Sequence, residues 1–147
     1  MQTLEDIIFE WLTDPDCFSE ALIKKADVYP YIRQDSDRNA MNRPWCEYQI
    51  VVRSTESTGA GALNTEARFK NIGIEIALCT AKPSKQIDLV ILGDILDDFF
   101  RNATHGRPAL GQAGFRKAVL TGPNPDHQPK YYQARWFLDG QILVSNA

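Results

Sequence analysis

The sequence predicts an α+β fold: a mostly antiparallel sheet of about four or more strands, one long helix packed on it, and a short N-terminal helix. Three observations lead to this prediction. Several segments alternate apolar and polar residues with a period of two, one segment carries a broad apolar stripe at helical spacing, and the connections between them are short. The 147 residues fit a single domain, 1–147. We expect neither a secretory signal nor a membrane span, since the N-terminus lacks a basic segment and no apolar run is long enough.

The N-terminal third begins with a predicted helix over residues 4–12, where apolar side chains recur at helical spacing until Asp14 and Pro15 end it. Residues 17–29 are expected to form a short helical turn and then an extended piece. Residues 33–43 contain three arginines and two aspartates and almost no apolar side chain. We expect this segment to be a loop that faces solvent, with contact to a phosphate or an acidic partner as the alternative.

The remaining elements follow from changes of period. After Pro44, Cys46, Tyr48, Ile50 and Val52 alternate with polar residues and predict a half-buried strand, and residues 54–66 predict a long polar loop. Further strands are expected over 67–80 and 115–121, and a helix over 84–101. A proline-rich turn is expected over 122–129. Residues 130–144 predict one long strand, although Asp139-Gly140 allows a hairpin turn instead.

Residues that carry chemistry are few. Cys17, Cys46 and Cys79 have no paired spacing, so we expect them to be buried thiols rather than a disulfide framework or a zinc site. Asp94, Asp97 and Asp98 share one helix with core-facing neighbours and are expected on its solvent face. His105 and His127 lie in loops without a metal-binding spacing, and no serine-nucleophile or dinucleotide motif is present. The sequence therefore favours a binding or assembly module without a cofactor over an enzyme.

Charge is unevenly distributed along the chain, although the net charge is only −3. Residues 1–30 carry seven acidic residues and two lysines, whereas residues 103–138 carry five basic residues and one acidic residue. A solvated surface explains such a pattern, and so does a partner of complementary sign.

The order and spacing of these elements resemble one known family, the tail terminator or tail-completion proteins of long-tailed bacteriophages. The resemblance covers nearly the whole chain. It is carried by the helix at 4–12, the extended segment through Arg43-Pro44-Trp45 into residues 48–52, the polar loop 54–66, the strand at 69–76, the helix at 84–101, and the closing strands that end in residues 132–138.

The resemblance implies a structural virion protein that catalyses no reaction. It would form a ring, usually hexameric, that caps the tail tube, stops tube polymerisation and joins the tube to the head connector. Its partners would be further copies of itself, the tail tube protein and a head connector or neck protein, with no membrane and no sequence-specific nucleic acid. A closed ring needs two different patches on each subunit. The basic candidates for this interface are Arg53, Arg68, Arg116, Lys117 and Arg135.

Three alternatives remain open. The first is another neck, connector or minor capsid protein. The second is a small metal-dependent hydrolase that uses Asp94, Asp97, Asp98 and His127. The third is a ligand-binding α+β domain whose pocket is lined by four aromatic side chains, with core packing as the simpler role for the same residues: Trp45, Tyr48, Trp136 and Phe137.

Overall fold

The computed structural model describes residues 4–15, 17–18, 22–57, 67–82, 86–101 and 114–145. The elements follow the order α1 (Leu4–Leu12), a 3₁₀ turn (Lys25–Asp27), β1 (Val28–Tyr29), α2 (Asp35–Asn39), β2 (Trp45–Ser57), β3 (Ala67–Ala81), α4 (Gln86–Arg101), β4 (Phe115–Pro125) and β5 (Tyr131–Ser145). Within the described residues, none of the helices has the length and apolar character that crossing a bilayer requires.

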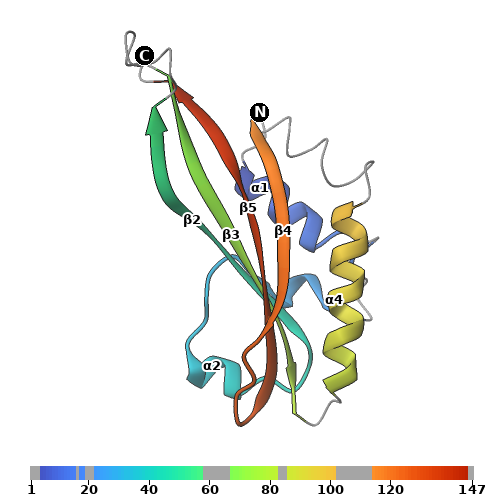
Figure 1. Ribbon diagram of the computed structural model, residues 1–147. Coiled ribbons are helices and arrows are strands. Elements are labelled where there is room, and N and C mark those ends of the chain that lie inside the picture. Colours follow the sequence, from blue (N-terminus) through green and yellow to red (C-terminus); the bar gives the residue numbers. More distant parts are fainter. Residues whose placement is uncertain are drawn as a thin grey trace.

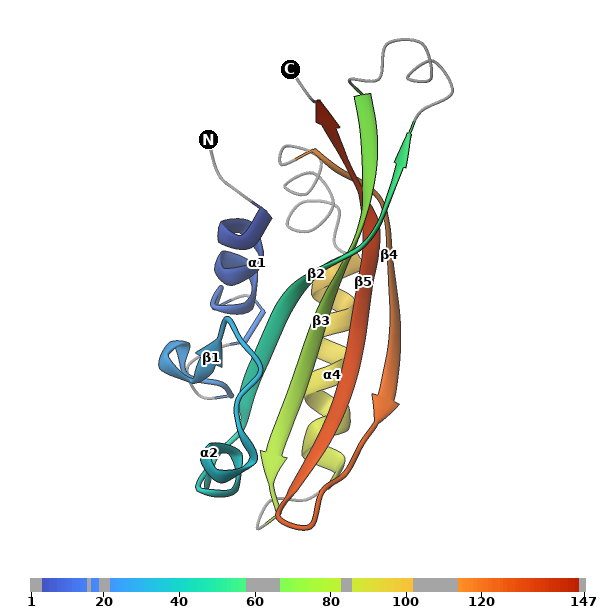
Figure 2. The ribbon, with the colours of Figure 1, turned by 90° about the vertical axis from the view of Figure 1, so that its left-hand side faces the viewer.

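The five strands form one sheet in the order β1-β2-β3-β5-β4. Figure 1 shows β2, β3, β5 and β4, and Figure 2 also shows β1. β1 runs parallel to β2 over two residues, and the other neighbouring pairs are antiparallel. The α+β class is therefore confirmed, but the sheet is mixed, and the expectation of a mostly antiparallel sheet needs this correction. The sequence missed the parallel pair because two residues are too few to show an alternating pattern.

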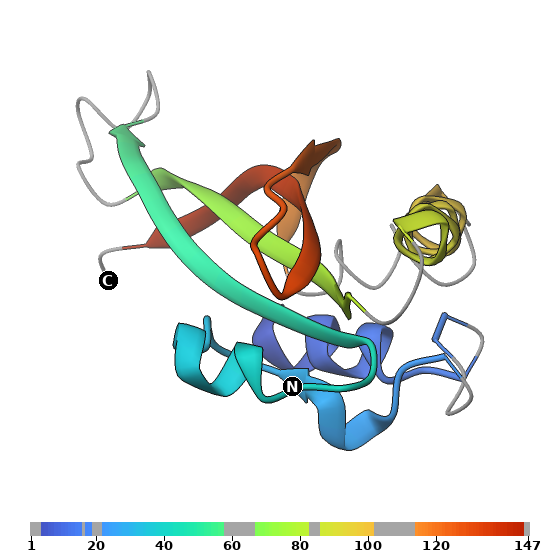
Figure 3. The same cartoon turned by 90° about the horizontal axis from the view of Figure 1, so that it is seen from below.

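Side chains alternate between two faces of the sheet, which differ in what covers them. The helix face packs against α1 and α4, as Figure 3 shows from below. The opposite side is called the outer face here, and the odd-numbered residues of β3, such as Glu75 and Cys79, lie on it. The main core forms between the sheet and the two helices, and Trp11 of α1 packs edge-on against Phe99 and Phe100 of α4.

The helices cover only part of the sheet. α4 has 16 residues, which corresponds to about 24 Å, whereas β5 has 15 residues and extends for about 50 Å. The upper ends of β2, β3 and β5 consequently extend beyond α4 (Figures 1 and 2). The sequence predicted a long helix over the sheet, and α4 is too short for that role.

Most predicted elements lie where the periodicity placed them. The helix at 4–12 is confirmed, and β5 is one long strand without a hairpin at Asp139-Gly140. β2 continues to Ser57 into the predicted loop, whose residues 58–66 lie outside the described part of the chain, as do residues 83–85 before α4. β4 continues to Pro125, so the turn before β5 is shorter than the predicted 122–129 segment.

Candidate functional site: the outer face of the sheet

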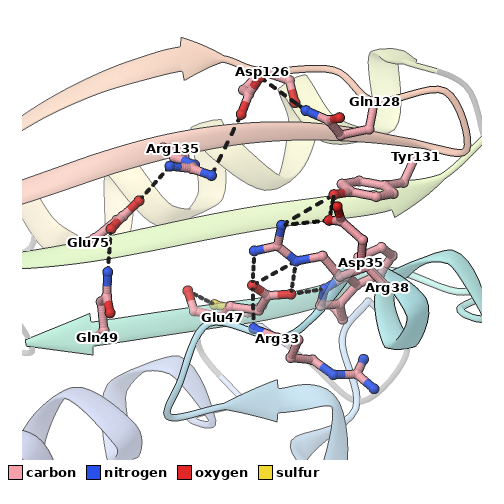
Figure 4. A network of polar contacts seen from close by, with 12 residues as sticks. Arg33, Asp35, Arg38, Glu47, Gln49, Glu75, Asp126, Gln128, Tyr131 and Arg135 are labelled. Carbon is pink, nitrogen blue, oxygen red and sulfur yellow. Dashed lines mark hydrogen bonds and ion pairs between the residues drawn. The ribbon is translucent and has the colours of Figure 1, made fainter.

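One end of the outer face is covered, and a buried ion pair fixes its cover. Glu47 of β2 has no solvent-exposed surface, and Arg38 of α2 is 6% exposed. The Arg38 guanidinium donates from Nη2 to Glu47 Oε1 at 2.6 Å and from Nε to Oε2 at 3.0 Å (Figure 4). Trp45 Nε1 donates to the same carboxylate at 2.8 Å, and the backbone N–H of Arg33 donates to it at 3.3 Å. Four donors from three segments therefore converge on one buried carboxylate.

Tyr131 of β5 completes this arrangement, which is called the buried end here. Arg38 Nη1 donates to the Tyr131 hydroxyl at 3.2 Å, and the Tyr131 ring packs edge-on against Trp45. Burial alone would lower the pKa of Arg38, but the hydrogen bonds and charge of Glu47 outweigh burial and raise it. The guanidinium thus stays charged at every accessible pH, and α2 is held against β2 and β5.

Most residues of 33–43 are exposed, as predicted, but the segment is not simply a loop: Asp35–Asn39 form the helix α2, and Arg38 is buried. The other two arginines of the segment are also engaged: Arg43 makes a bidentate ion pair with the buried Asp27, and Arg33 lies 4.0 Å from the centre of the Tyr29 ring. Two arginines of the segment, Arg38 and Arg43, thus neutralise buried acids on neighbouring elements. Spacing along the sequence does not reveal such pairs, although Trp45, on the strand face expected to be polar, was a signal that something covers it.

A row of polar contacts crosses the middle of the outer face (Figure 4). Gln49 Nε2 donates to Glu75 Oε2 at 2.7 Å, Arg135 lies 3.0 Å from Glu75 Oε1, and its other terminal nitrogen lies 3.6 Å from Asp126. The row links β2, β3, β5 and the turn after β4. It separates the buried end from the rest of the outer face.

Beyond this row the outer face is open, and no helix of the described part of the chain lies over it (Figure 2). This region is called the open end. A broad groove of about 650 Å³ lies there, lined by apolar and polar groups that include Lys117, Val119, Phe137, Asp139 and Gln141. Val119 is 57% exposed, and Val51 of β2 is 40% exposed on the same face. The open end therefore offers a mixed apolar and polar surface to the outside.

The five basic candidates for an interface are spread over the sheet. Lys117 lines the groove and is exposed, with a φ of 56° that puts it in the left-handed region. Arg135 forms ion pairs with Glu75 and Asp126, so its charge is already neutralised within the subunit. Arg53, Arg68 and Arg116 belong to β2, β3 and β4 respectively, but their side chains lie outside the described part of the structure.

The helix face holds a second pocket, of about 260 Å³, between α4 and the end of β4. Asp94, Asp97 and His127 line it, so three of the four residues of the hydrolase alternative meet there, while Asp98 is exposed elsewhere on α4. His127 Nδ1 accepts a hydrogen bond from the backbone N–H of Gln133 at 3.2 Å. Across the described residues, no group of three or more histidine, cysteine, aspartate or glutamate side chains is arranged to hold a metal ion.

The four aromatic residues of the ligand-binding alternative do not share a pocket. Trp45 is buried at the outer face, and Phe137 lines the groove of the open end. Tyr48 and Trp136 belong to the main core on the helix face. The sheet separates the two pairs, because odd and even positions of a strand point to opposite sides.

The three cysteines are buried free thiols, as the sequence predicted. Burial, with a smaller contribution from Asp14, raises the pKa of Cys17 to about 12. Burial also raises the pKa values of Cys46 and Cys79. These thiols are therefore protonated at neutral pH and are poor nucleophiles.

No protein-family model matches this chain, and a search of curated proteins finds no match either.

Proposed function

We propose that this protein is a structural subunit of a phage virion of the tail-terminator type. In this role it closes into a ring, hexameric as in that family, caps the tail tube, stops tube polymerisation and joins the tube to the head connector. It acts in the virion and in the host cytoplasm during assembly, through protein contacts alone.

One observation carries the proposal: the open end of the outer face. There the long strands extend beyond the helices, and exposed Val51 and Val119 lie on one surface with Phe137 and Lys117. Apolar side chains that a subunit leaves uncovered in this way favour contact with another protein chain. A function that depends on such contacts needs no enclosed reaction site.

The charge distribution supports two different patches on the subunit. α1 carries Glu5, Asp6 and Glu10 and no basic residue, whereas β4 carries Arg116 and Lys117 and no acidic residue. The two elements lie at opposite sides of the sheet order, since β4 is one edge strand and α1 packs near β2, where Glu5 lies beside Tyr48 and Gln49. Opposite charges on the two sides favour head-to-tail contacts over symmetric pairing of one patch with itself.

The direct test is capping of tail tubes. Purified chain is added to polymerising tail tube protein, and tube lengths and ends are examined by electron microscopy. The proposal predicts density at tube ends and arrested growth. Tubes that elongate normally with no bound protein would contradict it.

A matched pair of variants tests which surface is used. Lys117→Glu reverses a charge in the groove of the open end, whereas Lys130→Glu reverses an exposed charge beside the buried end. We expect the first variant to lose capping and the second to retain it. Equal capping by both variants would show that the open end does not contact the tail tube.

The same assay separates a tail terminator from another neck or connector protein. A terminator binds the tube end before any head is added, whereas a head-completion protein binds the connector and ignores free tubes. Binding to purified connector alone would therefore favour the neck-protein alternative.

The pocket on the helix face favours a second candidate, a ligand-binding or hydrolytic role. Asp94, Asp97 and His127 line the same 260 Å³ space, and Trp136 lies beside them. Carboxylates and a histidine around an apolar pocket suit a small cationic ligand. A thermal shift with added divalent cations or small amines, lost in Asp97→Asn, would support this candidate over pure assembly.

A further inference from the structure

Among the described residues, each of the two edges of the sheet has a stretch of strand without a neighbouring strand. The two stretches lie opposite one another across the sheet. At one edge, β1 pairs only with Cys46 and Glu47, so β2 has no strand beside it from Tyr48 onward within the described residues. At the other edge, β4 pairs with β5 on one side alone as far as the described residues go. Pro123 and Pro125 lack an N–H, and register shifts interrupt β4 after Arg116 and after Thr121. The regular open stretch of β4 is therefore residues 119–121.

A single row of paired residues crosses the sheet from one open stretch to the other. Val51 of β2 is opposite Gly73 of β3, Gly73 is opposite Asp139 of β5, and Asp139 is opposite Val119 of β4. Both ends of the row are exposed valines, Val51 at 40% and Val119 at 57%. An exposed apolar side chain on an unpaired strand edge promotes pairing with another chain.

The directions of the two edge strands allow copies to join in series. β2, β3, β5 and β4 alternate in direction, so β2 and β4 run opposite to one another. Rotation about an axis roughly parallel to the strands leaves these directions unchanged. β4 of one copy can then lie beside β2 of the next copy as an antiparallel neighbour, which is the geometry that backbone hydrogen bonding favours.

The edge of β2 is also shaped to receive a strand. A groove of about 450 Å³ lies along Tyr48, Gln49 and Ile50, and its lining also includes Tyr31 and Glu5 of α1. It continues directly from Val51 along β2. If Val119 lies beside Val51, the antiparallel direction carries Leu120 and Thr121 of the neighbouring copy into this groove.

We propose that the β4 edge of one copy of this chain adds to the β2 edge of the next, with Val119 beside Val51, so that the sheets of successive subunits become continuous around the ring. This inference rests on the proposed function and names the contact that builds the ring. The occupant of the β2 groove is thus a second copy of this chain, joined by strand addition. Because the two edges differ, the contact is head-to-tail, and closed symmetry limits its growth.

Cysteine cross-linking of the full chain tests the contact. The double variant Val51→Cys/Val119→Cys is compared with each single variant after mild oxidation with diamide, on a non-reducing gel. Because both valines are exposed, we expect the variants to fold. Circular dichroism spectra of the variants check this. We expect the double variant to give a ladder of multimers and each single variant to give monomer.

Three outcomes would overturn the inference. A dimer from Val51→Cys alone would mean that two β2 edges pair with each other, and a dimer from Val119→Cys alone would mean the same for two β4 edges. Absence of any cross-link in the double variant, when light scattering shows the oligomer intact, would mean that the ring uses another surface. That last result leaves the proposed function standing, whereas a chain that never oligomerises and never binds tubes removes both proposals.

A second measurement avoids oxidation. Val119→Asp places a charge at the β4 edge, and Val90→Asp is its control, since Val90 is also about half exposed but lies on α4. We expect Val119→Asp to raise the concentration at which the oligomer half-dissociates by about tenfold or more, as for a central contact residue. Val90→Asp should leave that concentration unchanged, and equal effects of the two variants would contradict the assignment.

Discussion

The two ends of the outer face are built on the same strands and yet differ in almost every respect. At the buried end, the Glu47 carboxylate has no exposed surface and receives hydrogen bonds from Arg38, Trp45 and Arg33. At the open end, Lys117 and Val119 lie exposed around a wide groove. The polar row through Glu75 and Arg135 lies between the two ends.

The difference shows how one sheet face serves both stability and assembly. A buried charge that loses its partner costs several kcal/mol, so the buried end ties α2 firmly to the sheet. Exposed side chains contribute little to the stability of the subunit, so the open end is free to carry contacts to other chains. Changes at the buried end should therefore affect folding, and changes at the open end should affect association.

The largest effect is expected from Glu47→Gln. The amide keeps the shape of the side chain but leaves the Arg38 guanidinium buried without its counter-charge, so the free energy of unfolding should fall by about 3–5 kcal/mol. Urea denaturation measures the change. Asp35→Asn is the matched control, because Asp35 also pairs with Arg38 but its side chain is 80% exposed. Its effect should stay below about 0.5 kcal/mol, and equal losses in the two variants would contradict the account.

A smaller effect is expected from Tyr131→Phe. This change removes the hydroxyl that accepts a hydrogen bond from Arg38 and keeps the ring against Trp45. Because a hydrogen bond to a charged group is lost, the free energy of unfolding should fall by about 1–2 kcal/mol. Tyr31→Phe, at a tyrosine that is 54% exposed, should change it little. No loss in Tyr131→Phe would mean that water replaces the hydroxyl and that the buried end is less sealed than described.

Thiol chemistry distinguishes buried from exposed positions without testing stability directly. Raising the pKa of Cys17 from 9 to about 12 lowers its thiolate population about a thousandfold at neutral pH. Native Cys17 and Cys79 should therefore resist iodoacetamide at pH 8, whereas the engineered thiol of Val90→Cys, at a half-exposed position of α4 outside the proposed contact, should react readily. Mass spectrometry of the labelled peptides measures this. Rapid labelling of Cys79 in the folded protein would contradict a sealed buried end.

The same pKa shift predicts a pH dependence of stability. Because the folded-state pKa of Cys17 is raised, its contribution is fully present below about pH 9 and is lost as the pH rises toward about 12. Burial raises the pKa of Tyr48 to about 12, which acts in the same direction. The free energy of unfolding should thus fall between pH 9 and pH 12. Urea denaturation at a series of fixed pH values measures this. A free energy of unfolding that does not change over this range would contradict the burial of Cys17 and Tyr48.

The smallest effect on folding is expected at Lys117. Lys117→Asn removes the charge and introduces a residue type that tolerates the positive φ of this position. The free energy of unfolding should change by less than about 0.5 kcal/mol. A loss of 2 kcal/mol or more in urea denaturation would place Lys117 in the fold rather than in an interface, and would remove the contrast between the two ends.

Periodicity predicted the elements well where each has one covered face. The helix at 4–12 and the long strand ending the chain follow from side-chain spacing alone, because burial on one side leaves a regular apolar pattern. The mixed character of the sheet was not predicted, since β1 contributes two residues. α4 covers only part of the sheet because it is shorter than the strands. Side-chain periodicity predicts each element separately and does not compare the length of a helix with that of a strand.

The buried end escaped prediction because it depends on partners distant in sequence. Arg38 meets Glu47 nine positions away and Tyr131 93 positions away, and the second contact exists only once β5 lies in the sheet. Of the proposed interface residues, Lys117 lies in the open groove, whereas Arg135 is engaged within the subunit. Sequence spacing identified these basic residues, but the ion pairs of Arg135 are visible only in the folded chain.

The central claim, that the open end joins copies of this chain into a closed ring, is tested most directly by light scattering of the full chain over a wide range of concentrations. The account predicts one defined oligomer with a mass that is a whole multiple of 16.6 kDa, six-fold if the ring is hexameric, formed alone or on tail tubes. A chain that remains at 16.6 kDa at every concentration, with and without tail tubes, would contradict it.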